Sequence, residues 1–112
     1  MNETYPDSGR ECVRRMLEAF AEPRMPIISS FFGIYVRMYF ADHGPPHIHV
    51  EYQGHEALIA ISSGAVLAGT LPRRALSLVG QWRLDHAQEL EQNWLRAQAL
   101  QPLVRIPGAD ND

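Results

Sequence analysis

The sequence predicts an α+β domain in which an antiparallel four-stranded β-meander packs against two C-terminal helices, with an extra helix at the N-terminus. Three observations predict this class. Apolar and polar residues alternate in short runs between residues 34 and 66. Turn-forming glycines and prolines separate these runs. After residue 71, apolar residues repeat at helical spacing.

The 112 residues are expected to form one domain with two short additions. We expect residues 1–24 to form a helical appendage, because Ser8 and Glu11 have capping-box spacing and apolar residues then follow at helical intervals. Two prolines favour an extended link after it. The α+β domain is expected over residues 25–106, followed by a polar tail over residues 107–112.

Three consecutive segments alternate as half-buried strands do, at residues 34–40, 47–52 and 57–61, and a fourth strand is expected around Val66. The register follows from requiring all the apolar faces to coincide, since a slip of one residue would reverse every side chain. It pairs Arg37 with Glu51, Tyr39 with His49, Val50 with Ile59 and Ile61 with Val66. The polar side chains of the first two strands, His47 and His49 among them, are then expected to share the opposite face, which is exposed to solvent.

The C-terminal part predicts two helices. Pro72 lies in the first turn of one, which carries an apolar stripe, and Asp85 is expected to cap the next. One long, bent helix is the alternative. Trp82 and Trp94 are expected in the core or between the helices, and residues 104–106 could add an edge strand.

The composition excludes several function classes. A net charge of −3 disfavours electrostatic binding of nucleic acid over a broad surface but permits contact with one phosphate group. All ten basic residues are arginine, which excludes Schiff-base chemistry and a Walker-type phosphate loop. The single Cys12 cannot form an intramolecular disulfide, and no apolar run has the length of a spanning helix. We therefore expect a cytoplasmic protein.

The residues that could do chemistry gather in residues 42–49, which hold Asp42, His43, His47 and His49. On a strand, His47 and His49 project from the same face with Cα atoms about 6.5–7 Å apart. This arrangement suits two ligands of one metal ion or two groups flanking a reacting phosphate. In a metal site, Asp42 or His43 would be the third ligand of a divalent transition metal such as zinc.

The metal-free interpretation is the one we adopt, and it needs no cofactor. His47 and His49 would act as acid and base, Arg37 would contact the phosphate and Tyr39 would orient the site, as cleavage of RNA by its 2′-hydroxyl requires. In a third interpretation the histidines are surface or packing residues.

Arg73 and Arg74 lie in the first turn of a predicted helix, where positive charge is mildly unfavourable. A bound anion would explain their placement, whereas solvation or a surface ion pair is the alternative. Together with Asp42 and His43, they are the candidate substrate-binding residues.

Several separated motifs resemble those of the bacterial domain-of-unknown-function family 4160. They are MPIIS at residues 25–29, FFGI at 31–34, RMYF at 37–40, DH at 42–43, PPHIHV at 45–50, LPRRAL at 71–76 and NW at 93–94. The resemblance marks Asp42, His43, His47 and His49 as the family's histidine motif. It carries no established reaction. Met25 matches the customary first residue, so the early helix is either a partner-binding addition or the result of an upstream choice of start.

Members of that family are commonly encoded beside the family numbered 2442, an arrangement that suggests toxin–antitoxin modules. The resemblance therefore implies a paired, cytosolic bacterial protein with a small cognate protein as partner and no membrane contact. Our leading hypothesis is that it is the toxin-like member of the pair and acts on RNA through His47 and His49. An oligomer is compatible with the sequence. Two alternatives belong to other classes: a non-enzymatic interaction or regulatory domain, and a small metal-binding protein.

Overall fold

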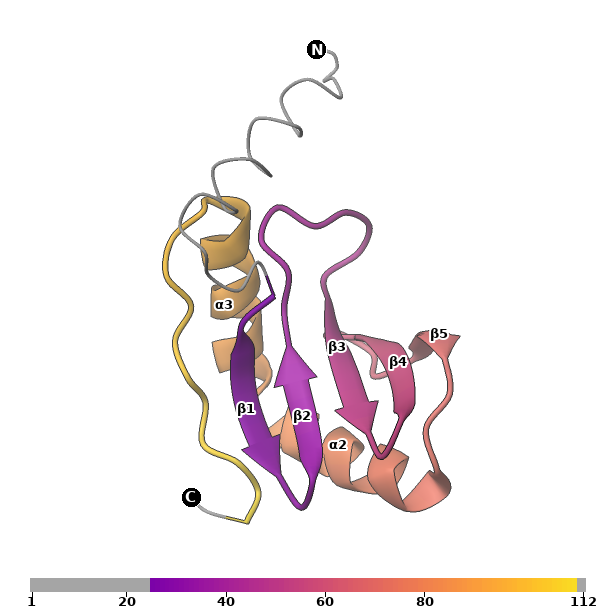
Figure 1. Cartoon of the computed structure of the whole chain (residues 1–112). Coiled ribbons are helices and arrows are strands. Elements are labelled where there is room, and N and C mark those ends of the chain that lie inside the picture. Colours follow the sequence, from indigo (N-terminus) through magenta and orange to yellow (C-terminus); the bar gives the residue numbers. More distant parts are fainter. Residues whose placement is uncertain (1–24, 111–112) are drawn as a thin grey trace.

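The structure is a computed structural model that describes residues 25–110, so the predicted N-terminal helix lies outside the described residues. It confirms an α+β fold in which an antiparallel sheet is followed by two helices (Figure 1). The sheet has five strands in sequence order: β1 (Ile27–Phe31), β2 (Ile34–Arg37), β3 (His47–Tyr52), β4 (His55–Ala60) and β5 (Val66–Gly69). The helices are α2 (Arg73–Asp85) and α3 (Ala87–Gln98), and they pack on one face of the sheet.

The predicted count of four strands is wrong because β1 was missed. A bulge between Ile27 and Ser29 interrupts the pairing of β1 with β2. Ile28 and Ser29 are consequently both buried, and the sequence of β1 shows no clean alternation. A strand of this kind cannot be recognised by a period of two.

The predicted register of the first hairpin is wrong by two residues. Arg37 pairs with His49, whereas Tyr35 takes the place opposite Glu51. The reason is that β2 ends at Arg37, so the connection to β3 begins earlier than predicted and Tyr39 lies outside the strand. A shift of two residues leaves each side chain on its original face, so Arg37 and His49 still share one face of the sheet.

The second hairpin differs in the same way. Its turn residues are Gln53 and Gly54, both with positive φ (47° and 85°), as a two-residue hairpin turn of type I′ requires. Val50 therefore pairs with Ala57 and not with Ile59. The predicted pair of Val50 with Ile59 assumed a turn at Gly54 and His55, one residue later, which moved the pairing by two.

At the last strand pair, Ile59 and not Ile61 lies opposite Val66. Val66 is 43% exposed, and all four residues of β5 are exposed. The prediction that β5 contributes to the common core is therefore wrong. β5 lies at the edge of the sheet, beyond the part that the helices cover.

The core lies between the sheet and the two helices. Trp82 of α2 is 1% exposed and Trp94 of α3 is 8% exposed, which confirms both as core residues. The Trp82 ring packs on Phe31 of β1, with 5.2 Å between ring centroids. The other large core side chains are Ile28, Ile34, Val36, Met38, Ile48, Val50, Ile59, Ile61, Leu71, Val79, Leu90 and Ile106.

The two helices are separated by a single residue, His86. The prediction that Asp85 caps the second helix is wrong, since Asp85 is the last residue of α2 and its carboxylate accepts a hydrogen bond from Gln81. His86 precedes α3 without a side-chain capping bond. Neither α2 nor α3 is long and apolar enough to cross a membrane.

Asn93 of α3 fastens the chain that follows the helices. Its amide nitrogen donates to the Val104 carbonyl at 2.7 Å, and its amide oxygen accepts from the Val104 N–H at 2.8 Å. Asn93 is 1% exposed, and its buried amide bonds both backbone groups of Val104, as a neighbouring strand would. The expected edge strand at 104–106 does not form, although the Ile106 N–H donates to the Ile28 carbonyl of β1.

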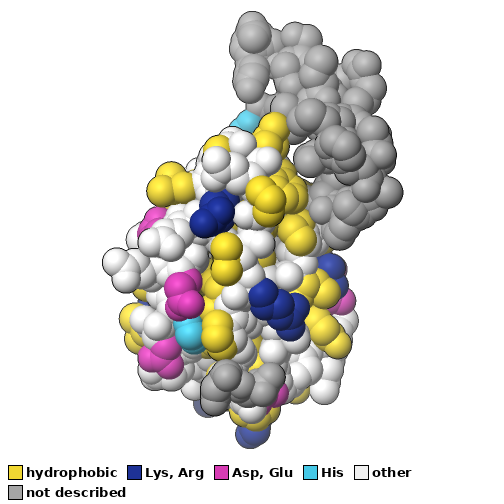
Figure 2. All heavy atoms as spheres, turned by 90° about the vertical axis from the view of Figure 1, so that its left-hand side faces the viewer, with side chains coloured by type: hydrophobic (Ala, Val, Ile, Leu, Met, Phe, Trp, Pro, Cys, Tyr) yellow, Lys and Arg dark blue, Asp and Glu magenta, His cyan; other side chains and the backbone are white. Residues whose placement is uncertain are grey.

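The predicted polar tail also contacts the domain. The Trp82 indole N–H donates to the Pro107 carbonyl at 2.9 Å, and the Asp110 carboxylate accepts from the backbone N–H of Phe32. Figure 2 looks onto this side of the molecule, where apolar side chains are intermixed with arginines and carboxylates. Residues 107–110 therefore belong to the packed structure.

Candidate functional site

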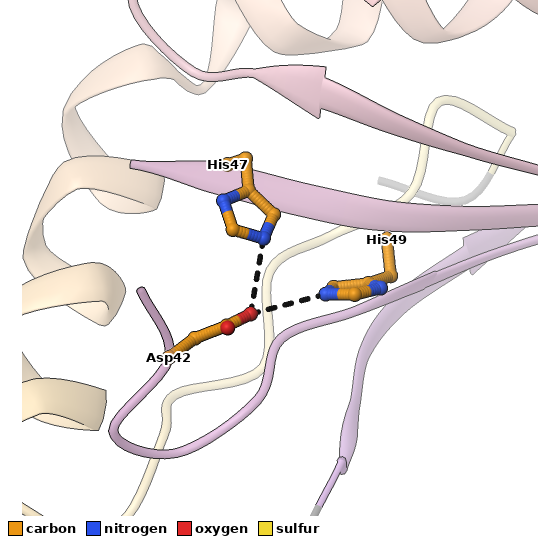
Figure 3. A group of neighbouring side chains, drawn as sticks. All are labelled: Asp42, His47 and His49. Carbon is orange, nitrogen blue, oxygen red and sulfur yellow. Dashed lines mark hydrogen bonds and ion pairs between the residues drawn. The ribbon is translucent and has the colours of Figure 1, made fainter. Parts of the chain in front are cut away.

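The histidine motif lies where the connection between β2 and β3 enters β3. Asp42 comes from the connection, and His47 and His49 come from alternate positions of β3 (Figure 3). One carboxylate oxygen, Asp42 Oδ2, lies 3.0 Å from His47 Nε2 and 3.2 Å from His49 Nε2. Both imidazole rings thus point their Nε2 edges at the same oxygen atom.

The Asp42 carboxylate is held in this direction by its other oxygen. Oδ1 accepts a hydrogen bond of 2.8 Å from the backbone N–H of His43. The backbone carbonyl of Asp42 accepts from the Gln98 amide at 3.1 Å, and the N–H of Ala41 donates to the Ala97 carbonyl at 3.1 Å. The end of α3 therefore positions the connection that carries the carboxylate.

His47 is buried, with 6% of its surface exposed. Its Nδ1 lies 2.8 Å from the Pro45 carbonyl oxygen. The His47 ring packs on Trp94 at a centroid distance of 5.4 Å and lies 5.1 Å from the His49 ring. The expectation that both imidazoles face solvent is therefore wrong for His47. The α3 side chain that covers it comes from a distant part of the sequence.

His49 is the more accessible imidazole, with 23% of its side chain exposed. The Tyr39 ring lies over it at a centroid distance of 4.4 Å. Burial lowers the pKa of His49 below 6.5, and nearby His47 acts in the same direction, while the hydrogen bond and charge of Asp42 oppose the shift. The lowered pKa of His49 favours the neutral imidazole at pH 7, which leaves a lone pair on its ring.

A groove of about 220 Å³ opens beside His49 on the sheet face away from the helices. Its lining includes Arg37, Tyr39, His49 and Leu58. Arg37 lies directly across from His49 in the β2–β3 register, and its guanidinium is 3.3 Å from the Glu51 carboxylate. The groove therefore brings an imidazole and the Arg37–Glu51 ion pair to the same opening, and Glu56 adds a second carboxylate to its lining.

The structure gathers five of the predicted site residues: Asp42, His47, His49, Arg37 and Tyr39. The His43 side chain is exposed and offers no atom to this group. Arg73 and Arg74 are exposed at the start of α2, at the end of the molecule opposite the β2–β3 connection (Figure 1). Candidate substrate contacts at Arg73 and Arg74 are therefore separate from this site.

Two contributors to the site were missed in the sequence. The Pro45 carbonyl holds the His47 ring, but a backbone acceptor leaves no signal in residue types. Trp94 covers His47, although the helical spacing of Trp94 only indicated a core position. Both contacts require the tertiary fold to be known.

Comparison with protein families gives one match, to the domain of unknown function DUF4160 over residues 33–95. A search of curated proteins and a search of solved structures each found no significant match. The matched residues run from the end of the first turn to α3 and include Asp42, His47 and His49. Because this match spans more than half of the 112 residues, the chain belongs to the DUF4160 family.

Proposed function

We propose that this chain is the toxin-like component of a bacterial two-component module and cleaves RNA at the Asp42–His47–His49 centre. One observation carries the proposal: two imidazoles converge on one carboxylate oxygen beside a groove that also presents Arg37. Such convergence of titratable groups in a concave site is typical of catalytic centres. The toxin-like context comes from the family resemblance.

RNA is a suitable substrate because it carries its own nucleophile. The 2′-hydroxyl oxygen forms a bond to phosphorus, the bond from phosphorus to the 5′ oxygen breaks, and a proton passes from the first oxygen to solvent or to the leaving oxygen. The site must activate the hydroxyl and stabilise negative charge on the phosphate. Arg37 lines the groove and would share its guanidinium between Glu51 and one phosphate group of the substrate.

Two chemistries are open to the three central residues. Imidazoles can transfer protons directly, or they can hold a metal ion that acts as a Lewis acid. His49 faces the groove, whereas His47 is buried. In direct proton transfer His49 would therefore be the imidazole that reaches the substrate, whereas both imidazoles would be ligands of a metal ion.

The proposal predicts that Asp42→Asn and His49→Ala each slow cleavage of single-stranded RNA at least about 100-fold, the usual lower range for such groups. The purified full chain and each variant are assayed with a fluorogenic oligonucleotide, and circular dichroism verifies the fold. His55→Ala is the matched control, since His55 is an exposed histidine outside the group. Cleavage at the parental rate by both variants would refute the proposal.

Expression in a bacterial host provides a second readout. We expect the parent chain to arrest growth and His49→Ala to relieve the arrest at equal protein level. A small cognate protein is the proposed partner, and its co-expression should restore growth with the parent chain. Equal arrest by the parent and His49→Ala would show that the toxicity does not use this site.

A further inference from the structure

We infer that Asp42, His47 and His49 bind a single divalent transition metal ion, with zinc as the representative, through one carboxylate oxygen and two Nε2 atoms. The ligand atoms of these three residues all lie within 4.8 Å of one another. They form the one such group found among residues 25–110. Binding of the ion stands apart from RNA cleavage, and only its catalytic use rests on the proposed function.

The spacing of the ligand atoms fits such an ion. Zinc bonds of about 2.0–2.1 Å to nitrogen and oxygen in tetrahedral geometry imply about 3.3 Å between ligand atoms. The Asp42 oxygen lies 3.0 Å and 3.2 Å from the two histidine nitrogens. Figure 3 shows both rings directing these nitrogens toward the carboxylate from one side. Small adjustments of the three side chains would bring all the ligand atoms to the spacing that the ion requires.

The hydrogen bonding of His47 favours a positive charge between its ring and Asp42, which either a metal ion or a second ring proton would supply. Its Nδ1 faces the Pro45 carbonyl, which can only accept, so Nδ1 carries the ring proton. In the neutral ring Nε2 then has a lone pair, and that lone pair faces a carboxylate oxygen at 3.0 Å. A metal ion between the two atoms removes this repulsion. A ring N–H held by a carbonyl is also the usual support of a metal-bound histidine.

The donor set selects the class of ion. Two imidazole nitrogens and one carboxylate oxygen suit zinc and its transition-metal neighbours, whereas magnesium and calcium prefer oxygen ligands alone. Three protein ligands leave at least one coordination position for water or substrate, as catalytic sites do. Asp42 and His49 are each more than one-fifth exposed, so this position is accessible from solvent. Bound there, the ion would neutralise charge on a phosphate oxygen.

Metal binding is tested on the full chain after chelation and dialysis, by calorimetric titration with zinc chloride and by the visible absorption of added cobalt. We expect about one zinc ion per chain and a cobalt spectrum of nitrogen and oxygen coordination. Asp42→Asn and His49→Ala should each weaken zinc binding at least about 100-fold, because loss of supporting contacts alone costs about 10–100-fold. Magnesium should not compete.

His43→Ala is the matched control, because His43 belongs to the same sequence motif but contributes no ligand atom. Its zinc affinity should remain within about threefold of the parent value, an effect expected of a non-ligand. Absence of stoichiometric zinc uptake by the parent would overturn the inference, as would undiminished uptake by both Asp42→Asn and His49→Ala. Zinc binding without RNA cleavage would support the metal site while contradicting the proposed function.

Discussion

Replacing Gly69 with alanine is expected to destabilise the fold by roughly 3 kcal/mol or more, from a left-handed backbone and an overpacked contact together. Gly69 has φ of +79°, and an added Cβ would lie 2.1 Å from the Glu56 carbonyl oxygen and 2.9 Å from the Ala57 Cα. The Glu56 oxygen also accepts the Thr70 N–H at 3.0 Å. The methyl group would force β5 away from β4 and break this bond. Urea unfolding followed by circular dichroism measures the loss.

Substitutions at two other glycines separate the cost of the left-handed backbone from the cost of the close contact. Gly54→Ala meets no atom within 4 Å but has φ of +85°, so it should cost only about 1–2 kcal/mol. Gly80→Ala lies in α2 with open space around it and should stabilise the fold by about 1 kcal/mol. Equal effects of Gly69→Ala and Gly54→Ala would contradict the proposed contact with Glu56.

Replacing Asn93 with alanine is expected to destabilise the fold by about 2–4 kcal/mol, because it leaves two backbone groups of Val104 without partners in a partly buried setting. Loss of the Asn93 amide would also detach from α3 the C-terminal segment that carries Ile106. Ile106 is 1% exposed, so its release would remove apolar packing as well. Thermal and urea unfolding provide the measurement.

Glu91→Ala is the matched control for this change, since Glu91 is exposed on the same helix. Its effect should stay within about 0.5 kcal/mol, as is usual for surface substitutions. A variant as stable as Glu91→Ala would mean that the Val104 groups are satisfied by water.

The sequence predicted the elements whose periodicity is regular. β2, β3 and β4 alternate, and α2 and α3 carry apolar stripes, so their existence and faces were predictable. The register was not, because it depends on where a turn begins. Gln53 adopts positive φ at the second hairpin, which residue type did not indicate. The bulge in β1 likewise hid a strand whose Ile28 is fully buried.

The candidate site was predictable in its members but not in its environment. Asp42, His47 and His49 are close in sequence, and alternation on β3 puts both histidines on one face. The burial of His47 could not be predicted, because it depends on Trp94 from a separate element. The same holds for Arg73, whose helix begins at the opposite end of the molecule.

The three central groups are carried by different layers of the protein. His47 and His49 belong to the sheet, while the connection bearing Asp42 is fastened to the last turn of α3 through Ala97 and Gln98. The distance from the Asp42 carboxylate to the two imidazole rings therefore depends on the position of α3 relative to the sheet. A displacement of α3 by one ångström would separate the carboxylate from both rings while leaving every strand pair intact.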